Sequence, residues 1–196
     1  MVLGSVLVFS ALGLFLSNES EQQQAEEAVL SIMPQIVEEI HERNEEAVEE
    51  TQLSPQEREN KEMPVTQIDG NNYIGFVGLP TLQQELPVMA DWSYPQLKIA
   101  PCRFMGSTYS DDLVIMAHNF DKHFGSLKDL RAEDIVTFTD MDGQTIRYRV
   151  VTLDILGPDD VEDMTSGDYD LTLFTCTYGG KSRVTVRCDR AENETE

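Results

Sequence analysis

The sequence predicts a mainly β protein, a closed or nearly closed β-barrel with an N-terminal helical extension. After Ile68, apolar residues either alternate with polar ones or gather in short runs, which is the pattern of half-buried and buried strands. Turn signals rich in Gly, Asp and Asn separate many of these runs. Seven or eight short strands within ~120 residues, with few helical segments among them, favour a barrel.

An uncharged apolar run opens the chain, from Val2 to Leu16. Its length of about 15 residues is slightly below the ~20 that a helix needs to cross a bilayer. A signal peptide is one alternative, but no Lys or Arg precedes the run and no convincing small-x-small cleavage site follows it. Burial as a core helix and a start further upstream are two others. We favour a transmembrane anchor or signal-like segment over residues 1–18 that holds the rest outside the cell.

Residues 19–67 are predicted to form an acidic helix and a linker. Apolar residues recur at three- and four-residue spacing over residues 21–50, which predicts an amphipathic helix, bent or restarted near Pro34. Its acidic residues are expected on a solvated face, so the helix either spaces the anchor from the next domain or packs on it. The polar stretch SPQERENKEMP contains two prolines and predicts a linker. Residues 68–196 then form the barrel domain.

Composition excludes several functional classes. The formal net charge of -22 argues against a nucleic-acid partner, because phosphate contacts require clustered Lys and Arg. The three cysteines are too few for a disulfide scaffold and lack the paired spacing of a zinc site. There is also no glycine-rich phosphate loop. The sequence thus predicts neither a metal nor a cofactor.

Cys176 and His118 are candidate chemical residues because each ends an apolar strand. Cys176 follows DLTLFT, and at a strand end its side chain can leave the barrel wall and meet a substrate. A buried structural thiol is the alternative. His118 follows DDLVIMA, where a hydrogen-bonded structural histidine is the alternative. His123, in the loop that follows, is a competing candidate.

Arg183 opens the strand after the Gly-Gly turn, seven residues beyond Cys176. A hairpin at this turn would bring Arg183 close to Cys176. Arg187 shares its face by period two, and either arginine could simply pair with surface carboxylates. A cation stabilises a thiolate, and a fixed guanidinium can bind the oxyanion that acyl transfer develops. Cys176, His118 and Arg183 would thus supply nucleophile, proton shuttle and oxyanion clamp.

These residues stand in segments that resemble the sortases, the cysteine transpeptidases of Gram-positive bacterial surfaces. LTLFTC is similar to the sortase TLxTC strand, and MAHNFDKHFGSLKDL to the segment that carries the sortase histidine. SRVTVR resembles the strand that begins at the catalytic arginine, and YIGFVGLPTLQQELPV resembles the first two barrel strands. The resemblance spans residues 68–190.

The resemblance implies an eight-stranded sortase-type β-barrel with Cys176 as nucleophile, His118 as general acid and base, and Arg183 as the residue that steadies substrate and oxyanion. Thr175 would help to shape the substrate-binding site. The resemblance also implies an LPxTG-like sorting signal on a surface protein, a thioester intermediate, and an acceptor amine from a cell-wall precursor or a pilin. The enzyme would be held at the cell membrane with its catalytic domain outside.

Several points stay open at this stage. The interval from Cys176 to Arg183 is shorter than in many sortases, which keeps Arg187 as an alternative.

The sortase subclass is also open. The helix before the barrel is similar to that of class B sortases, but the stretch before the penultimate strand is too short for the helix that class B enzymes have there. Cys102 and Cys188 could pair in an oxidising exterior or remain separate buried thiols. A cysteine peptidase that hydrolyses the thioester, and a non-catalytic surface-binding barrel, are the alternative functions.

Overall fold

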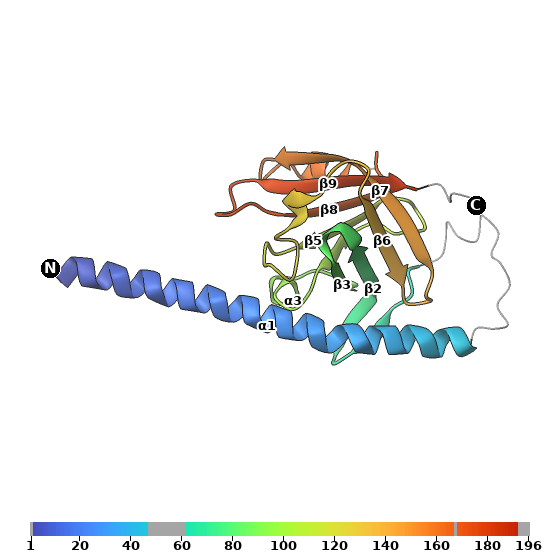
Figure 1. The fold of residues 1–196 in the computed structure, drawn as a ribbon, viewed down its shortest axis with the longest axis horizontal. Coiled ribbons are helices and arrows are strands. Elements are labelled where there is room, and N and C mark those ends of the chain that lie inside the picture. The colour runs from blue at the N-terminus through green and yellow to red at the C-terminus, as the bar shows by residue number, and fades with distance from the viewer. Residues whose placement is uncertain (1, 47–61, 167, 192–196) are drawn as a thin grey trace.

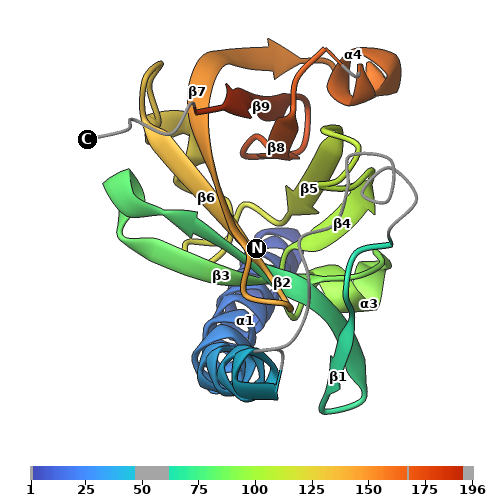
Figure 2. The same ribbon diagram turned by 90° about the vertical axis from the view of Figure 1, so that its right-hand side faces the viewer.

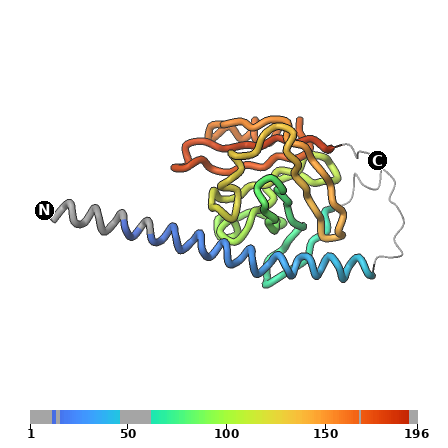
Figure 3. The backbone as a smooth tube through the Cα atoms, viewed as in Figure 1, coloured from blue at the N-terminus to red at the C-terminus, as the bar shows by residue number. Residues whose placement is uncertain are grey.

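A computed structural model describes residues 2–46, 62–166 and 168–191, and within α1 it leaves the side chains of 2–11, 14, 15 and 46 undescribed. Figure 3 traces the backbone with the uncertain residues in grey. The helices are α1 (Val2–Glu46), α3 (Tyr94–Leu97) and α4 (Val161–Thr165), with short 3-10 turns η1 (Pro80–Leu82) and η2 (Leu127–Asp129). The strands are β1 (Thr66–Ile68), β2 (Asn71–Leu79), β3 (Gln84–Met89), β4 (Cys102–Met105), β5 (Leu113–Ala117), β6 (Ile135–Asp140), β7 (Thr145–Leu156), β8 (Leu171–Cys176) and β9 (Arg183–Arg190).

The strands form one sheet that closes into a barrel. Neighbouring strands follow the order β1-β2-β3-β4-β5-β8-β9-β7-β6, and an additional pairing of β2 with β6 closes the ring. Strands β2 to β9 therefore make an eight-stranded barrel, with β1 attached to the outside of the ring. The predicted fold class, a mainly β barrel with an N-terminal helix, is confirmed (Figures 1 and 2). Parallel pairing occurs between β3 and β4 and between β5 and β8.

Period-two alternation of side chains fills the barrel interior. One face of most barrel strands contributes to a single buried cluster, because successive side chains of a strand point to opposite faces. Fully buried members of this cluster include Val77, Val88, Ile115, Phe138, Tyr148, Leu173 and Val186. The apolar side chains on the outer face of the sheet are buried by other elements, among them α1 and α4.

Helix α1 covers part of the outer face of the barrel. Ile32, Ile36 and Ile40 project from one side of the helix and pack against Tyr73, Met89 and Cys102 of the sheet. The amphipathic helix is confirmed, and it packs on the barrel instead of only spacing it. Figure 1 shows α1 running along the barrel and projecting beyond it at the end where the β8–β9 turn lies.

The predicted restart near Pro34 does not occur. A single helix runs through Pro34 and across the predicted boundary at residue 18. A proline removes one helical hydrogen bond, but burial of Ile32 and Ile36 on either side holds the helix together by tertiary contact. Most of the predicted linker falls within residues 47–61, outside the described residues. Within the described part of the chain, no helix combines the length and apolarity needed to cross a membrane.

Barrel closure depends on a close approach of β2 to β6 at Gly75. This glycine has a φ of +140°, and a Cβ built on it would lie 1.9 Å from the carbonyl oxygen of Thr139. Because the obstacle is backbone, it cannot rotate away. We expect Gly75→Ala to lower the free energy of unfolding by about 3 kcal/mol or more, as measured by urea denaturation.

Gly70→Ala is the matched control for this substitution. Gly70 also has a positive φ, +79°, but nothing lies within 4 Å of an added Cβ. Its cost should therefore be the backbone strain alone, on the order of 1 kcal/mol. Equal losses in the two variants would show that the contact between β2 and β6 is not what makes Gly75 necessary.

Candidate active site

The strand pairing brings the predicted site residues to one end of the barrel. In the parallel pair β5–β8, Ala117 is the partner of Thr175, and each is followed by a candidate residue, His118 and Cys176. In the antiparallel pair β8–β9, Cys176 is itself the partner of Arg183. His118, Cys176 and Arg183 thus stand side by side on three adjacent strand ends.

Cys176 belongs to the outer face of the barrel. Leu171 and Leu173 point into the interior cluster, whereas Phe174 belongs to a separate outer cluster with Val114 and Met164. Cys176 lies two residues after Phe174 and shares its face, and its side chain is partly exposed. The sulfur is therefore accessible from outside the barrel, as a nucleophile must be.

An apolar surface leads along the outer face toward Cys176. Phe104, Met116 and Leu156 are partly buried against the outer cluster, and Met164 of α4 forms one side of it. Sequence reasoning missed these residues as part of the site. Their signal was the second face of the alternating strands DDLVIMA and DLTLFT, which carries large apolar residues although it points away from the barrel core.

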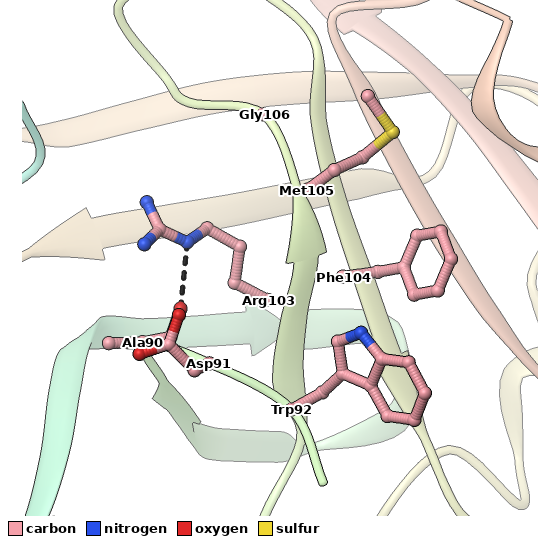
Figure 4. A pocket seen from close by; sticks show the side chains of 7 residues that line it. All are labelled: Ala90, Asp91, Trp92, Arg103, Phe104, Met105 and Gly106. Carbon is pink, nitrogen blue, oxygen red and sulfur yellow. Dashed lines mark hydrogen bonds between the residues drawn. The ribbon is translucent and has the colours of Figure 1, made fainter.

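A pocket of about 390 Å³ adjoins this surface beside β4. Figure 4 shows Trp92 and Phe104 on one side of the strand and Arg103, which donates from Nε to the carbonyl of Ala90 at 2.8 Å, on the other. Trp92 stacks on Phe104 with ring centroids 5.8 Å apart, and Phe104 meets Phe174 edge-on at 5.6 Å. A series of aromatic rings thus connects the pocket with the strand that carries Cys176.

His118 is half-buried and held by a neighbouring ring. Its imidazole stacks on Phe120 with centroids 4.8 Å apart. Burial lowers the pKa of His118 below its ordinary 6.5, while Glu21 raises it and Lys98 lowers it. The imidazole is therefore predominantly neutral near pH 7 and can accept a proton.

His123, the competing candidate, lies in the interior. Its side chain is fully buried, with Nε2 3.3 Å from the carbonyl oxygen of Ile99. Burial lowers the pKa of His123 to about 4, so it stays neutral at physiological pH. It contacts the ring of Phe120 from a centroid distance of 5.5 Å and supports the loop that follows His118. This placement favours a structural role.

The two candidate arginines of β9, Arg183 and Arg187, lie in different surroundings. Arg183 faces Cys176, and its Nη1 donates to the carbonyls of Gly180 and Ser182, both at 3.1 Å, within the β8–β9 turn. Arg187 faces Thr172, four residues before Cys176, and is only 3% exposed.

Arg187 holds the segment around α4 against β8 through both of its terminal nitrogens. It donates to the carbonyls of Asp163 and Met164 and to the hydroxyl of Thr172. It also pairs with Asp154 at 3.6 Å and lies over the ring of Tyr169. Of the two arginines, the geometry therefore favours Arg183 as the partner of the nucleophile.

Thr175 fastens the two strands that carry His118 and Cys176. Its hydroxyl donates to the carbonyl of Ala117 at 2.8 Å, and the side chain is only 3% exposed. The residue thus shapes the site from the interior side of the sheet.

The other two cysteines are separate buried thiols. Cys102 lies under α1, whereas Cys188 lies in the barrel interior, and both are free. Two strands stand between β4 and β9. At about 4.8 Å per strand the separation is roughly 14 Å, too far for a disulfide. Burial raises the pKa of the Cys102 thiol to about 12, and it raises that of Cys188 as well. The suggested disulfide between them is therefore wrong.

Comparisons with known proteins agree with this geometry. The model of the sortase domain matches residues 77–191. Sortase C1 from Streptococcus suis is 25% identical, over 63% of this chain and 75% of that one, with a TM-score of 0.53. Sortase C1 from Streptococcus agalactiae is 23% identical, over 91% and 98% of the two chains, with a TM-score of 0.58. Sortase A from Corynebacterium diphtheriae is 19% identical, over 94% and 98%, with a TM-score of 0.57.

A comparison with curated proteins gave no match. The family match nevertheless covers more than half of the chain, and it includes the strands that carry all three candidate residues. Members of this family are cysteine transpeptidases. On the family match and the barrel topology together, the chain belongs to the sortase family.

Proposed function

We propose that the protein is a sortase-type cysteine transpeptidase that cleaves an LPxTG-like sorting signal and transfers the surface protein to an amine. The observation that carries this proposal is the strand register that aligns His118, Cys176 and Arg183 at one edge of the barrel. The partly exposed sulfur at the end of an apolar outer surface gives a peptide both a place to lie and a nucleophile to meet.

The first half-reaction forms a thioester. His118 takes the proton of the Cys176 thiol, and the sulfur attacks the carbonyl carbon of the threonine in the sorting signal. The guanidinium of Arg183 stabilises the resulting oxyanion. As the intermediate collapses, the carbon–nitrogen bond breaks, and His118 returns its proton to the leaving amine. Cys176 then holds the N-terminal part of the substrate as an acyl group.

The second half-reaction releases the product to an acceptor. The nitrogen of an amine attacks the thioester carbonyl, His118 accepts the proton of that amine, and the Cys176 sulfur leaves and is reprotonated. The acceptor is the amine of a cell-wall precursor or of a pilin lysine. A structure of the Streptococcus pneumoniae sortase C, 22% identical, is described with reference to its pilin substrate specificity.

The thioester can be observed directly. Incubation with a sorting-signal peptide should produce a covalent adduct that mass spectrometry maps to Cys176, and Cys176→Ala should abolish it. Adding a pilin-type lysine peptide or a cell-wall peptide should convert the adduct into a joined product. Release of only the free acid would favour the peptidase alternative. If a broad peptide panel gave neither adduct nor cleavage, the enzyme proposal would be overturned in favour of a binding barrel.

The two arginines provide a matched pair of substitutions. We expect Arg183→Lys to lower kcat by roughly 100-fold, because a lysine cannot reproduce the forked contact with an oxyanion. The free energy of unfolding should change by less than about 0.5 kcal/mol, because Arg183 is partly exposed at the first position of β9.

Arg187→Lys should show the reverse pattern. Loss of its buried hydrogen bonds to the segment around α4 should lower the free energy of unfolding by about 2 kcal/mol. Its effect on kcat per folded molecule should be the smaller of the two. Urea denaturation and peptide-cleavage kinetics on both variants measure the two patterns. A larger loss of kcat in Arg187→Lys would reverse the assignment.

We further propose that residues 1–18 anchor the chain in the cell membrane, with residues 19–67 as a connecting segment and residues 68–196 as the catalytic domain outside the cell. The uncharged apolar run from Val2 to Leu16 supports this arrangement. Cell fractionation should place the full chain with the membranes, and protease added to intact protoplasts should degrade the barrel. Removal of residues 1–18 should release the protein from the membrane. Recovery of the truncated protein in the membrane fraction would contradict the anchor.

A further inference from the structure

Helix α1 contacts the segments that surround His118 at the end of the barrel. Lys98, directly after α3, pairs through Nζ with Glu21 Oε1 of α1 at 2.8 Å. We propose that Glu21 and Lys98 are positioning residues for His118, acting as an ion pair that reaches from α1 to the site and balances the charge around the imidazole. This inference rests on the proposed function, since it assigns a task to the helix outside the barrel.

A continuous series of contacts connects Lys98 with His118. The next residue, Ile99, offers its carbonyl to Nε2 of the buried His123 at 3.3 Å. The ring of His123 lies 5.5 Å from that of Phe120, on which the ring of His118 stacks at 4.8 Å. A displacement of the segment after α3 would therefore be transmitted to the imidazole of His118 through the rings of His123 and Phe120.

Burial of α1 keeps the ion pair in place. Ala25 and Val29, one and two turns after Glu21, are buried, so this part of the helix is fixed to the barrel by apolar contact. Glu21 and Lys98 themselves keep side-chain exposures of 37% and 52%. Partly exposed pairs contribute little to stability. A role in the electrostatics of the site explains the pair better than a role in holding the fold.

The titratable and charged groups around His118 come from several elements. Glu21 approaches from α1, Lys98 from the end of α3, His123 from the same loop, and Cys176 and Arg183 from β8 and β9. The carboxylate of Glu21 favours the imidazolium and raises the pKa of His118, whereas the ammonium of Lys98 lowers it. While the two are paired, their effects oppose each other, so removing either one should unmask the other.

Because Glu21 and Lys98 shift the pKa of His118 in opposite directions, removing each charge should shift that pKa with the opposite sign. Glu21→Gln should lower the pKa of His118, and Lys98→Met should raise it, each by a few tenths of a unit as expected for partly screened charges. The double variant should lie between the two. The pKa is read from an NMR titration of protein with labelled histidines in a Cys176→Ala background, and a His118→Gln variant identifies the signal.

A second ion pair on the same helix serves as the matched control. Glu26 of α1 and Lys122 of the histidine loop approach to 3.7 Å with similar exposure, but neither is among the main charges that shift the pKa of His118. Glu26→Gln and Lys122→Met remove the same charges from the same helix and from the loop. They should move the pKa of His118 by less than about 0.1 unit.

Kinetics then connect the pair with the reaction. In the Cys176-containing enzyme, the acid limb of the kcat/KM profile should shift downward in pH for Glu21→Gln and upward for Lys98→Met, with KM little changed. Shifts of the same sign in both variants, or shifts no larger than in the controls, would overturn the inference. The NMR result does not depend on turnover. Absence of cleavage by the wild-type enzyme would therefore count against the proposed function alone.

Discussion

The parallel pairing of β5 with β8 is the constraint on which the site depends. Inward-facing Leu113 and Ile115 on one strand, and Leu171 and Leu173 on the other, fix the register, because a slip by one residue would turn an apolar set out of the core. At the last residue pair of the two strands, the buried hydroxyl of Thr175 donates a hydrogen bond to the carbonyl of Ala117. The next residue on each strand is then His118 or Cys176. The packing that stabilises the barrel thus also aligns the two candidate catalytic residues.

The outer face of the closed barrel is buried by other elements to different extents in different places. Helix α1 buries the outer side of β2 and β3, while α4 and a few aromatic rings cover β5 and β8 only in part. The partly covered region is the one that ends at Cys176. Trp92 and Tyr94 at its border remain 42% and 76% exposed. In the proposed function, an extended peptide would lie on this apolar strip beside the Cys176 thiol, so the incomplete cover would serve recognition at the expense of burial.

Local sequence patterns predicted the strands, the amphipathic helix and the hairpin that pairs Cys176 with Arg183, because each depends on periodicity or on a turn within a few residues. The crossover that sets β5 beside β8 depends on distant segments, and motif resemblance supplied what periodicity could not. Period two placed Arg183 and Arg187 on one face and left Arg187 as an alternative, whereas the register pairs Cys176 with Arg183 and Thr172 with Arg187. The contact of Glu21 with Lys98 could not be predicted from the sequence either, because nothing in a sequence distinguishes one charged residue of a solvated helix face from another.

The contrast between the two arginines shows how one strand can carry both a fixed and an adaptable cation. Arg187 has buried acceptors for its guanidinium, so moving it would break its hydrogen bonds to the carbonyls of Asp163 and Met164. Among the residues that the structure describes, Arg183 bonds to carbonyls of the β8–β9 turn, where Gly179 and Gly180 both have positive φ and open space around them. Neutral carbonyl acceptors on this glycine-containing turn can give way to a charged one, since charge-assisted hydrogen bonds are stronger. In the proposed reaction, the oxyanion that develops beside Cys176 is such an acceptor.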